Sequence, residues 1–307
     1  MDPRRGYTLA VLNMLISGVA IYVNSLGVKM FADSTLYTAL KNAVVGIVLL
    51  AVVAFSRQSR QRMDRLTPLQ VMLLLLVALI GGSISYALYF RGLQLSTPVT
   101  ASLIDHTQFL LVAVFAAVFI GERFGPAIWA ALVVLLAGLT LGITVSAVRF
   151  DAGVLFISGA TVLFAADFVL MKYLLRSVAP LTVMLFKMSL GSLLLFGFVA
   201  ATGRLGLVAG LSFVQWAFVA VTGLMLLAFT ATSVLGLRLA SATAVTAIPA
   251  GSPIITTALV FVSQRSSIPP VRWLGLSLVL LAVLAIFIFG RRQERDAAGD
   301  PGEGRSP

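Results

Sequence analysis

The chain has 307 residues, of which 60% are hydrophobic and 11% are charged, and its mean hydropathy is +1.05. Soluble domains average about 45–50% apolar and about 25% charged residues, so this composition excludes a soluble globular protein. The net charge of +11 does not indicate nucleic-acid binding, because the Lys and Arg residues lie between long apolar runs. With no Cys and a single His, thiol chemistry and the common zinc motifs are excluded, and we expect no metal or other cofactor.

Ten apolar runs are each long enough to cross a membrane, which takes about 20 residues for a hydrocarbon core about 30 Å thick. They are too long and too rich in Leu for barrel strands, which alternate polar and apolar residues over about 10 positions. The sequence therefore predicts an all-α integral membrane protein with ten transmembrane helices. In chain order, these helices are expected near residues 7–28, 35–55, 68–90, 97–119, 125–147, 152–173, 180–201, 211–234, 241–262 and 269–290.

The placement of Lys and Arg predicts the orientation, because cytoplasmic loops carry an excess of basic residues. With the N-terminus inside, fourteen Lys and Arg residues fall in cytoplasmic segments and six in external ones. We therefore expect a multi-pass protein of the bacterial cytoplasmic (cell) membrane with both termini cytoplasmic. The first span is expected to be retained, since no small-residue cleavage site follows it. Residues 291–307 are charged and rich in Gly and Asp, and are expected to form a disordered cytoplasmic tail.

The second half of the chain repeats the first. A shift of 144 residues superposes Gly92 on Gly236, Pro126 on Pro270 and Trp129 on Trp273. We therefore predict two five-helix repeats, at residues 7–147 and 152–290. Because five is odd, the second repeat enters the membrane from the opposite side, which gives the inverted topology that many secondary transporters use. The alternative is a duplication that serves stability alone, although a purely structural bundle has no need of buried charge.

Four local patterns in the two repeats are distinctive. They are Tyr89-Phe90-Arg91-Gly92-Leu93-Gln94-Leu95-Ser96-Thr97-Pro98, Gly121-Glu122-Arg123 followed by Trp129, Gly236-Leu237-Arg238-Leu239-Ala240-Ser241-Ala242, and Pro253. In their order and spacing, the chain resembles the EamA-type branch of the drug/metabolite transporter superfamily over about residues 7–290. The second repeat departs from the family pattern in having Ser266 where a Glu is usual, and the first has Phe109 where the second has Pro253.

This resemblance implies a solute carrier of the cytoplasmic membrane, commonly an exporter of amino acids, other metabolites or drugs. It also implies a central cavity formed by spans 1, 3, 4, 6, 8 and 9. Spans 5 and 10 are implied to lie at the periphery, where they support dimers. We therefore expect a small-molecule substrate, contact with membrane lipid, and a monomer or homodimer.

Ionisable residues within the spans are the first candidates for function, because a charged side chain at the membrane centre costs about 2.5–3.5 kcal/mol on insertion scales. Asp105 and His106 lie near the middle of the fourth span and are candidates for substrate binding and proton coupling. Asp167, in the sixth span, is a candidate for substrate binding. The alternative for each is a structural hydrogen bond or ion pair between helices.

Neutral polar groups and a helix break complete the predicted substrate site. Pro249 removes a backbone hydrogen bond in the ninth span and falls on Asp105 when the repeats are superposed. Lys41 and Lys187 occupy equivalent spans, and either compensate an anionic group or hold the bundle together, which we consider the better interpretation. The remaining predicted site residues are Asn13, Asn24, Tyr86 and Gln108.

The leading hypothesis is a secondary transporter that works by alternating access, with protons as a candidate driving ion. An intramembrane enzyme is disfavoured, because the chain has no Gly-x-Gly-Asp segment beside a second Asp and no ligands for metal-assisted hydrolysis. A lipid-handling or non-transporting assembly component remains as the alternative.

Overall fold

The fold is seen in a computed structural model, which describes residues 3–56, 66–144, 152–264 and 269–299. Within these ranges the secondary structure is helical, with no strand. The first half contains α1 (Pro3–Val28), α2 (Ser34–Phe55), α4 (Pro68–Leu79), η1 (Ile80–Ile84), α5 (Ser85–Leu95), α6 (Pro98–Asp105), α7 (Gln108–Phe115), η2 (Ala116–Ile120) and α8 (Pro126–Thr144). The second half contains α9 (Ala152–Leu174), α10 (Pro180–Leu185), η3 (Phe186–Leu190), α11 (Gly191–Ala201), η4 (Leu205–Val208), α12 (Phe213–Leu239), α13 (Ala242–Ala247), η5 (Pro249–Gly251), α14 (Ser252–Gln264), α15 (Pro270–Ala285), η6 (Ile286–Gly290) and α16 (Arg291–Gly299).

Nine helical stretches within the described residues are long and apolar enough to cross a membrane. The predicted fifth span corresponds to α8, whose apolar stretch Pro126–Leu141 is shorter, and residues 145–151 beyond it lie outside the described ranges. The span predicted near 211–234 is longer than expected, because α12 continues to Leu239 before Ser241 caps the next helix.

Large apolar side chains cover the outside of the bundle. Phe55 is 91% exposed, Phe213 is 87% exposed and Val262 is 75% exposed. A water-soluble monomer rarely exposes contiguous apolar patches larger than a few hundred Å². The outer surface therefore suits contact with lipid, as the composition predicts.

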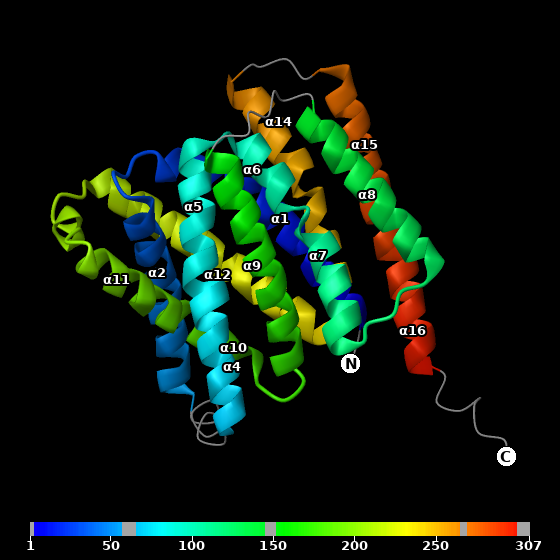
Figure 1. The fold of residues 1–307 in the computed structure, drawn as a ribbon, viewed down its shortest axis with the longest axis horizontal. Coiled ribbons are helices and arrows are strands. Elements are labelled where there is room, and N and C mark those ends of the chain that lie inside the picture. The colour runs from blue at the N-terminus through cyan, green and yellow to red at the C-terminus, as the bar shows by residue number, and fades with distance from the viewer. Residues whose placement is uncertain (1–2, 57–65, 145–151, 265–268, 300–307) are drawn as a thin grey trace.

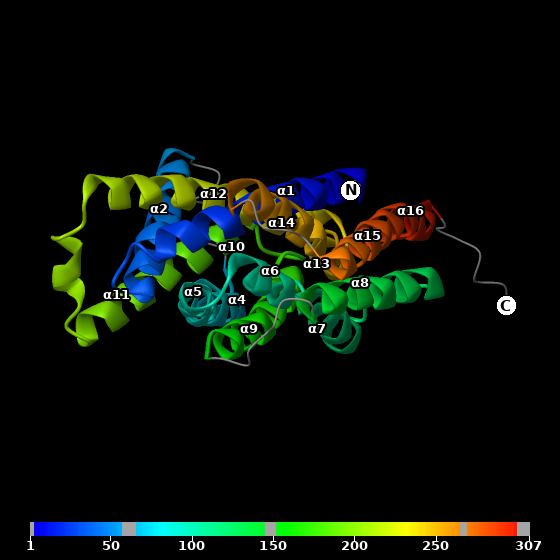
Figure 2. The same cartoon turned by 90° about the horizontal axis from the view of Figure 1, so that it is seen from above.

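Helices from the two halves pair in a reciprocal way. The first helix of each half packs on the third span of the other half. Thus α1 packs on α12, and α9 packs on α5. Other pairs join equivalent helices: α2 packs on α11, α6 on α14, and α8 on α15. Figure 2 shows α8 and α15 together at one side of the bundle, away from α2 and α11. Each half therefore depends on the other for its packing.

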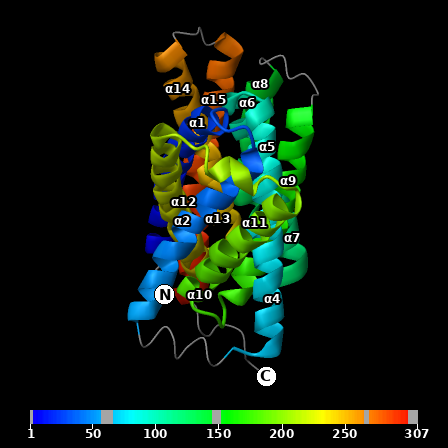
Figure 3. The same cartoon turned by 90° about the vertical axis from the view of Figure 1, so that its left-hand side faces the viewer.

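The described ends of the chain lie at one end of the bundle, which we call the terminal end. Figure 1 shows α1 beginning and α16 ending at its lower edge, and Figure 3 agrees. The connection between α1 and α2 lies at the opposite, upper end of Figure 1, whereas the connection between α9 and α10 lies at the terminal end.

The prediction of a disordered tail from residue 291 onward is wrong for its first part, because residues 291–299 form α16. Tertiary contacts hold this helix. The Gln293 side chain accepts a hydrogen bond from the Gly125 backbone N–H and donates one to the Arg123 carbonyl. Residues 300–307 lie outside the described ranges.

Candidate functional site

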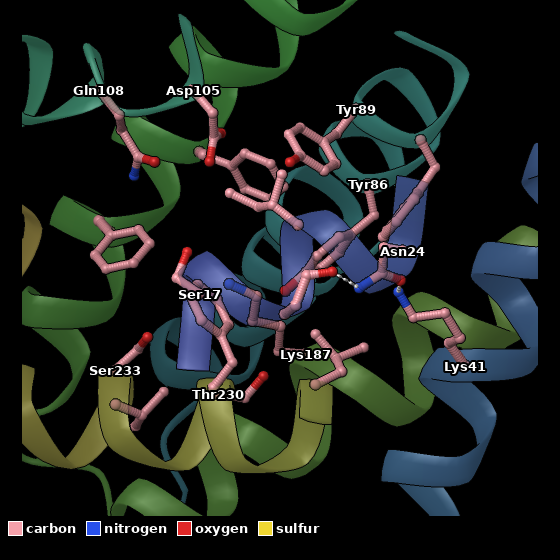
Figure 4. A pocket seen from close by; sticks show the side chains of 18 of the residues that line it. Ser17, Asn24, Lys41, Tyr86, Tyr89, Asp105, Gln108, Lys187, Thr230 and Ser233 are labelled. Carbon is pink, nitrogen blue, oxygen red and sulfur yellow. Dashed lines mark hydrogen bonds between the residues drawn. The ribbon is translucent and has the colours of Figure 1, made fainter. Parts of the chain in front are cut away.

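A cavity lies between the two halves, near the middle of the helices that surround it. Its lining residues come from spans 1, 2, 3, 4, 6, 7 and 8. Span 9, which the family resemblance implied, contributes none of them, whereas spans 2 and 7 contribute Lys41 and Lys187. The polar side chains around the cavity, shown in Figure 4, are Ser17, Asn24, Lys41, Tyr86, Tyr89, Asp105, Gln108, Lys187, Thr230 and Ser233.

The cavity is large enough for a small solute. The space open to the centre of a water molecule is about 90 Å³. One water needs roughly 10–15 Å³ of such space, so several waters or one small organic molecule fit. Aromatic side chains form much of the wall, including Phe90, Phe164 and Phe168.

Asp105 stands at a break in the fourth span. The α6 helix ends at Asp105 and α7 begins at Gln108, with a tight turn in which the Thr107 N–H donates to the Ile104 carbonyl at 3.0 Å. The ninth span breaks at the equivalent point, where α13 ends at Ala247 and η5 begins at Pro249. Proline explains the second break, but no proline stands at the first.

Four buried polar atoms around the cavity have no hydrogen-bond partner among the described residues. They are the Tyr89 hydroxyl, Oδ1 of Asp105, Nε2 of Gln108 and Oγ1 of Thr230. A buried polar group without a partner costs about 1–3 kcal/mol, so native proteins rarely leave one unmatched. Four on one cavity indicate that a solute or water in the cavity supplies their partners.

Asp167 and Lys187 form a buried ion pair beside the cavity. Lys187 Nζ donates to Asp167 Oδ2 at 2.5 Å, and the Asp167 side chain is 0% exposed. Asp167 itself does not line the cavity, whereas Lys187 does. Gly81 makes room for this pair, because a Cβ on Gly81 would lie 2.0 Å from Asp167 Cγ.

Lys41 has a different partner. Its Nζ donates to Oδ1 of Asn24 at 2.5 Å, and the same oxygen accepts a hydrogen bond from the Tyr37 hydroxyl at 2.9 Å. The ammonium lies 3.8 Å from the centroid of the Phe90 ring. Figure 4 shows Lys41 and Asn24 on one side of the cavity and Asp105 and Gln108 on another.

The predicted site is therefore brought together only in part. Asp105, Asn24, Tyr86 and Gln108 line the cavity, whereas Asp167 lies behind Lys187. Three further predicted residues do not line it, and each has a structural role. His106 bonds to the Ser252 hydroxyl, Asn13 Nδ2 donates to the Phe229 carbonyl at 2.9 Å, and Pro249 forms the break in span 9.

Sequence reasoning missed Tyr89, Ser17 and Ser233 as lining residues, and assigned Lys41 and Lys187 to structural roles. The signal for Tyr89 was its spacing of three residues from Tyr86, which places both rings on one face of α5. No comparable signal distinguishes Ser17 or Ser233 from the many other Ser residues of the spans.

A cluster of polar side chains, which we call the polar clamp, surrounds the joint between α12 and α13 at the terminal end. We define it as Tyr7, Glu122, Lys172 and Glu294. Glu122 accepts from the Ala242 N–H at 2.7 Å, and Glu294 accepts from the Ser241 N–H at 2.9 Å. Lys172 donates to the Leu237 carbonyl at 2.7 Å and to the Ala240 carbonyl, and Tyr7 donates to Glu294.

Comparison with known families agrees with this architecture. The profile of the EamA-like transporter family matches residues 4–144 and again residues 151–288. The chain belongs to the EamA-like transporter family. Each match covers one half, so the internal repeat is the family's own repeated unit. Family membership identifies a membrane transporter of the drug/metabolite transporter superfamily, and the multiple apolar helices agree with it.

A solved structure shares the fold of this EamA-like transporter. It is titled only "Crystal structure of protein", is 20% identical in sequence, and superposes with a TM-score of 0.70. The alignment covers 95% of this chain and 98% of that chain. At this identity the match supports the fold alone. No curated protein matches the chain.

Proposed function

We propose that this chain is a ten-helix secondary transporter that exports a small metabolite, amino acid or drug across the cytoplasmic membrane by alternating access. Both termini are cytoplasmic in this proposal. The observation that carries it is the central cavity, whose wall holds four buried polar atoms without partners among the described residues. A bundle that served stability alone would have no reason to retain them.

Matching hydrogen bonds at opposite ends of the bundle support an inverted repeat. In the first half, the capping box of Thr67 and Gln70 begins α4, and in the second half that of Ser212 and Gln215 begins α12. Each Gln side chain also reaches the connection after the first helix of the other half, at Ser177 and at Met30. A second matching pair of hydrogen bonds lies within the halves. Gln94 donates to the Phe31 carbonyl in the first half, and Arg238, 144 residues later, donates to the Val178 carbonyl in the second half.

The polar clamp supports alternating access, because the described residues at the opposite end of the bundle form no equivalent cluster. Lys172 bridges two carbonyls at the terminal end. Its repeat counterpart, Lys29, is exposed and makes no hydrogen bond or ion pair within the described residues. The two halves are similar, but their contacts at the two ends of the bundle differ. This difference fits a carrier with two states, of which this structure is the one with the terminal end closed to solutes.

Flux measured in proteoliposomes tests the transport proposal. We expect uptake of a substrate identified by thermal-shift screening, since a ligand that binds the folded state raises its stability. A protein that binds a solute but moves none of a broad metabolite panel, under any ion gradient, would contradict the proposal. Tight binding of lipid without any solute flux would favour the lipid-handling alternative.

The same assay tests Asp105 as the proton-coupling residue. Its carboxyl faces the cavity and Oδ1 has no protein partner, so a proton can reach it from the cavity. We expect Asp105→Asn to remove acceleration by a pH gradient and to retain counterflow, the exchange of labelled for unlabelled substrate. Asp33→Asn serves as the matched control, because Asp33 caps α2 at the far end of the bundle. A pH-driven flux that survives Asp105→Asn would exclude Asp105 from this role.

The polar clamp predicts a pH effect of its own. Burial raises the pKa of the Glu122 carboxyl above its ordinary value of 4.5, against the opposing effects of the Ala242 N–H and Lys172. Since the clamped carboxyl holds its proton more tightly than a solvated one, the clamp is strongest when Glu122 is protonated. It weakens as the pH rises from 4.5 through the raised pKa.

Hydrogen–deuterium exchange over residues 240–245, corrected for the intrinsic pH dependence of exchange, measures this effect. We expect protection to fall with rising pH in the native protein. In Glu122→Gln the side chain keeps an oxygen acceptor but does not titrate, so protection should vary less. Identical pH profiles for the two proteins would show that Glu122 does not govern the clamp.

A further inference from the structure

The two halves differ in how they neutralise a buried lysine. Lys41 and Lys187 lie in the second span of their halves, and each Nζ lies 2.5 Å from a side chain of the first span of the same half. For Lys187 that side chain is Asp167, which forms an ion pair. For Lys41 it is Asn24, which carries no charge. One half therefore holds a neutral pair and the other an uncompensated cation.

The surroundings of Lys41 stabilise the charged ammonium but do not neutralise it. Lys41 is 1% exposed, and the Phe90 and Tyr37 ring centroids lie 3.8 and 5.0 Å from its Nζ. Aromatic faces attract a cation, and Oδ1 of Asn24 accepts one of its three N–H donors. Among the described residues, Lys41 has no carboxylate partner and no second hydrogen-bond acceptor.

We propose that Lys41 is the binding site for the carboxylate group of a solute held in the central cavity. This inference rests on the proposed function, since the solute would be the transported substrate. Lys41 lines the cavity, so a solute can reach its two remaining donors. A buried charge without a counter-charge is unfavourable, and a carboxylate supplies the missing one.

The charge of the cavity favours a monovalent anionic group. Lys187 is neutralised by Asp167, so Lys41 is the only uncompensated cation among the described lining residues. A dianionic phosphate would leave surplus negative charge in a wall that already contains Asp105. The aromatic side chains Phe164 and Phe168 offer an apolar surface for the rest of the molecule.

The difference between the halves supplies the decisive variant. Asn24→Asp places a carboxylate beside Lys41 and reproduces the Asp167–Lys187 pair, so the protein should fold and its anion site should be lost. Lys41→Met removes the cation and keeps an apolar side chain of similar length. Gln70→Glu is the matched control. It makes the same amide-to-carboxylate change at an exposed capping box, where Glu is equally suitable.

Calorimetric titration of the purified protein compares carboxylates with their neutral amides. The probes are benzoate with benzamide, and 3-phenylpropanoate with 3-phenylpropanamide. We expect at least one carboxylate to bind the native protein more tightly than its amide, because a charge-assisted hydrogen bond changes affinity by about 10- to 100-fold. Asn24→Asp and Lys41→Met should lose this preference, and Gln70→Glu should retain it.

Two results would overturn the assignment: no carboxylate preference in the native protein, or a preference that survives both Asn24→Asp and Lys41→Met. Its loss in Gln70→Glu as well would also count against Lys41, because the effect would not be local. Flux of the same probes separates this inference from the transport proposal. Transport of amides without carboxylate preference would remove the anion site alone. Carboxylate binding that depends on Lys41, without any flux, would remove the transporter alone.

Discussion

Replacing Lys187 with Met is expected to lower the free energy of unfolding by about 3–5 kcal/mol, because the change leaves a buried carboxylate without its partner. Asp167 is 0% exposed, and its Oδ1 already has no hydrogen-bond partner among the described residues. Asp167 is therefore poorly placed to recover the loss from another group. The same change is expected to reshape the cavity, since Lys187 forms part of its wall.

The double variant Lys187→Met with Asp167→Leu distinguishes loss of charge balance from loss of packing. Leu has nearly the branched shape of Asp, and hydrophobic replacement of a buried ion pair is often neutral or stabilising. We expect the double variant to recover most of the lost stability. Unfolding of the purified protein in denaturant, followed by the fluorescence of Trp129, Trp216 and Trp273, measures both effects. A loss below about 1 kcal/mol in Lys187→Met would mean that the pair is not buried as described.

The second large effect is expected at Gly191, where two helices touch through their backbones. A Cβ on Gly191 would lie 2.4 Å from the Gly82 carbonyl oxygen, and a Cβ on Gly82 would lie 2.1 Å from the Lys187 carbonyl oxygen. Backbone atoms cannot move aside as the end of a side chain can. We expect Gly191→Ala to cost about 1–3 kcal/mol or more, and to shift Lys187 relative to the cavity.

Gly197 provides the control in the same helix, α11. A Cβ there would meet no atom within 4 Å, and Ala is favoured over Gly in a helix by roughly 0.5–1 kcal/mol. We therefore expect Gly197→Ala to be neutral or stabilising under the same denaturant titration. Equal effects of the two substitutions would mean that helix propensity, rather than contact between the two helices, determines the result.

Polar residues that face the cavity and polar residues that pair with each other occupy neighbouring positions in this protein. Asp105 and Lys41 face the cavity with unsatisfied capacity for hydrogen bonds, whereas Asp167 and Lys187 neutralise each other's charge. The repeat makes this contrast visible, because the same two spans carry Asn and Lys in one half and Asp and Lys in the other. A duplicated fold can thus keep one copy of a pair for stability and use the other for binding.

The membrane character, the helical spans and the repeat with its offset of 144 residues followed from the sequence alone. Each of these features can be read from the order of residues along the chain, without knowing which residues meet in space. The break in span 9 was also predicted, because Pro249 cannot donate the hydrogen bond that a continuous helix requires. The matching break at Asp105 was not, since no residue there forces it.

The tertiary structure alone decided which polar residues face the cavity. The spans are predominantly apolar, so their sequences do not indicate which face of each helix points inward. The way in which the helices pack therefore determines that Lys41 and Tyr89 line the cavity and that His106 bonds to Ser252. The sequence determined that charges would be buried within the membrane spans. Which of them found a partner within the protein was determined only when the two halves packed together.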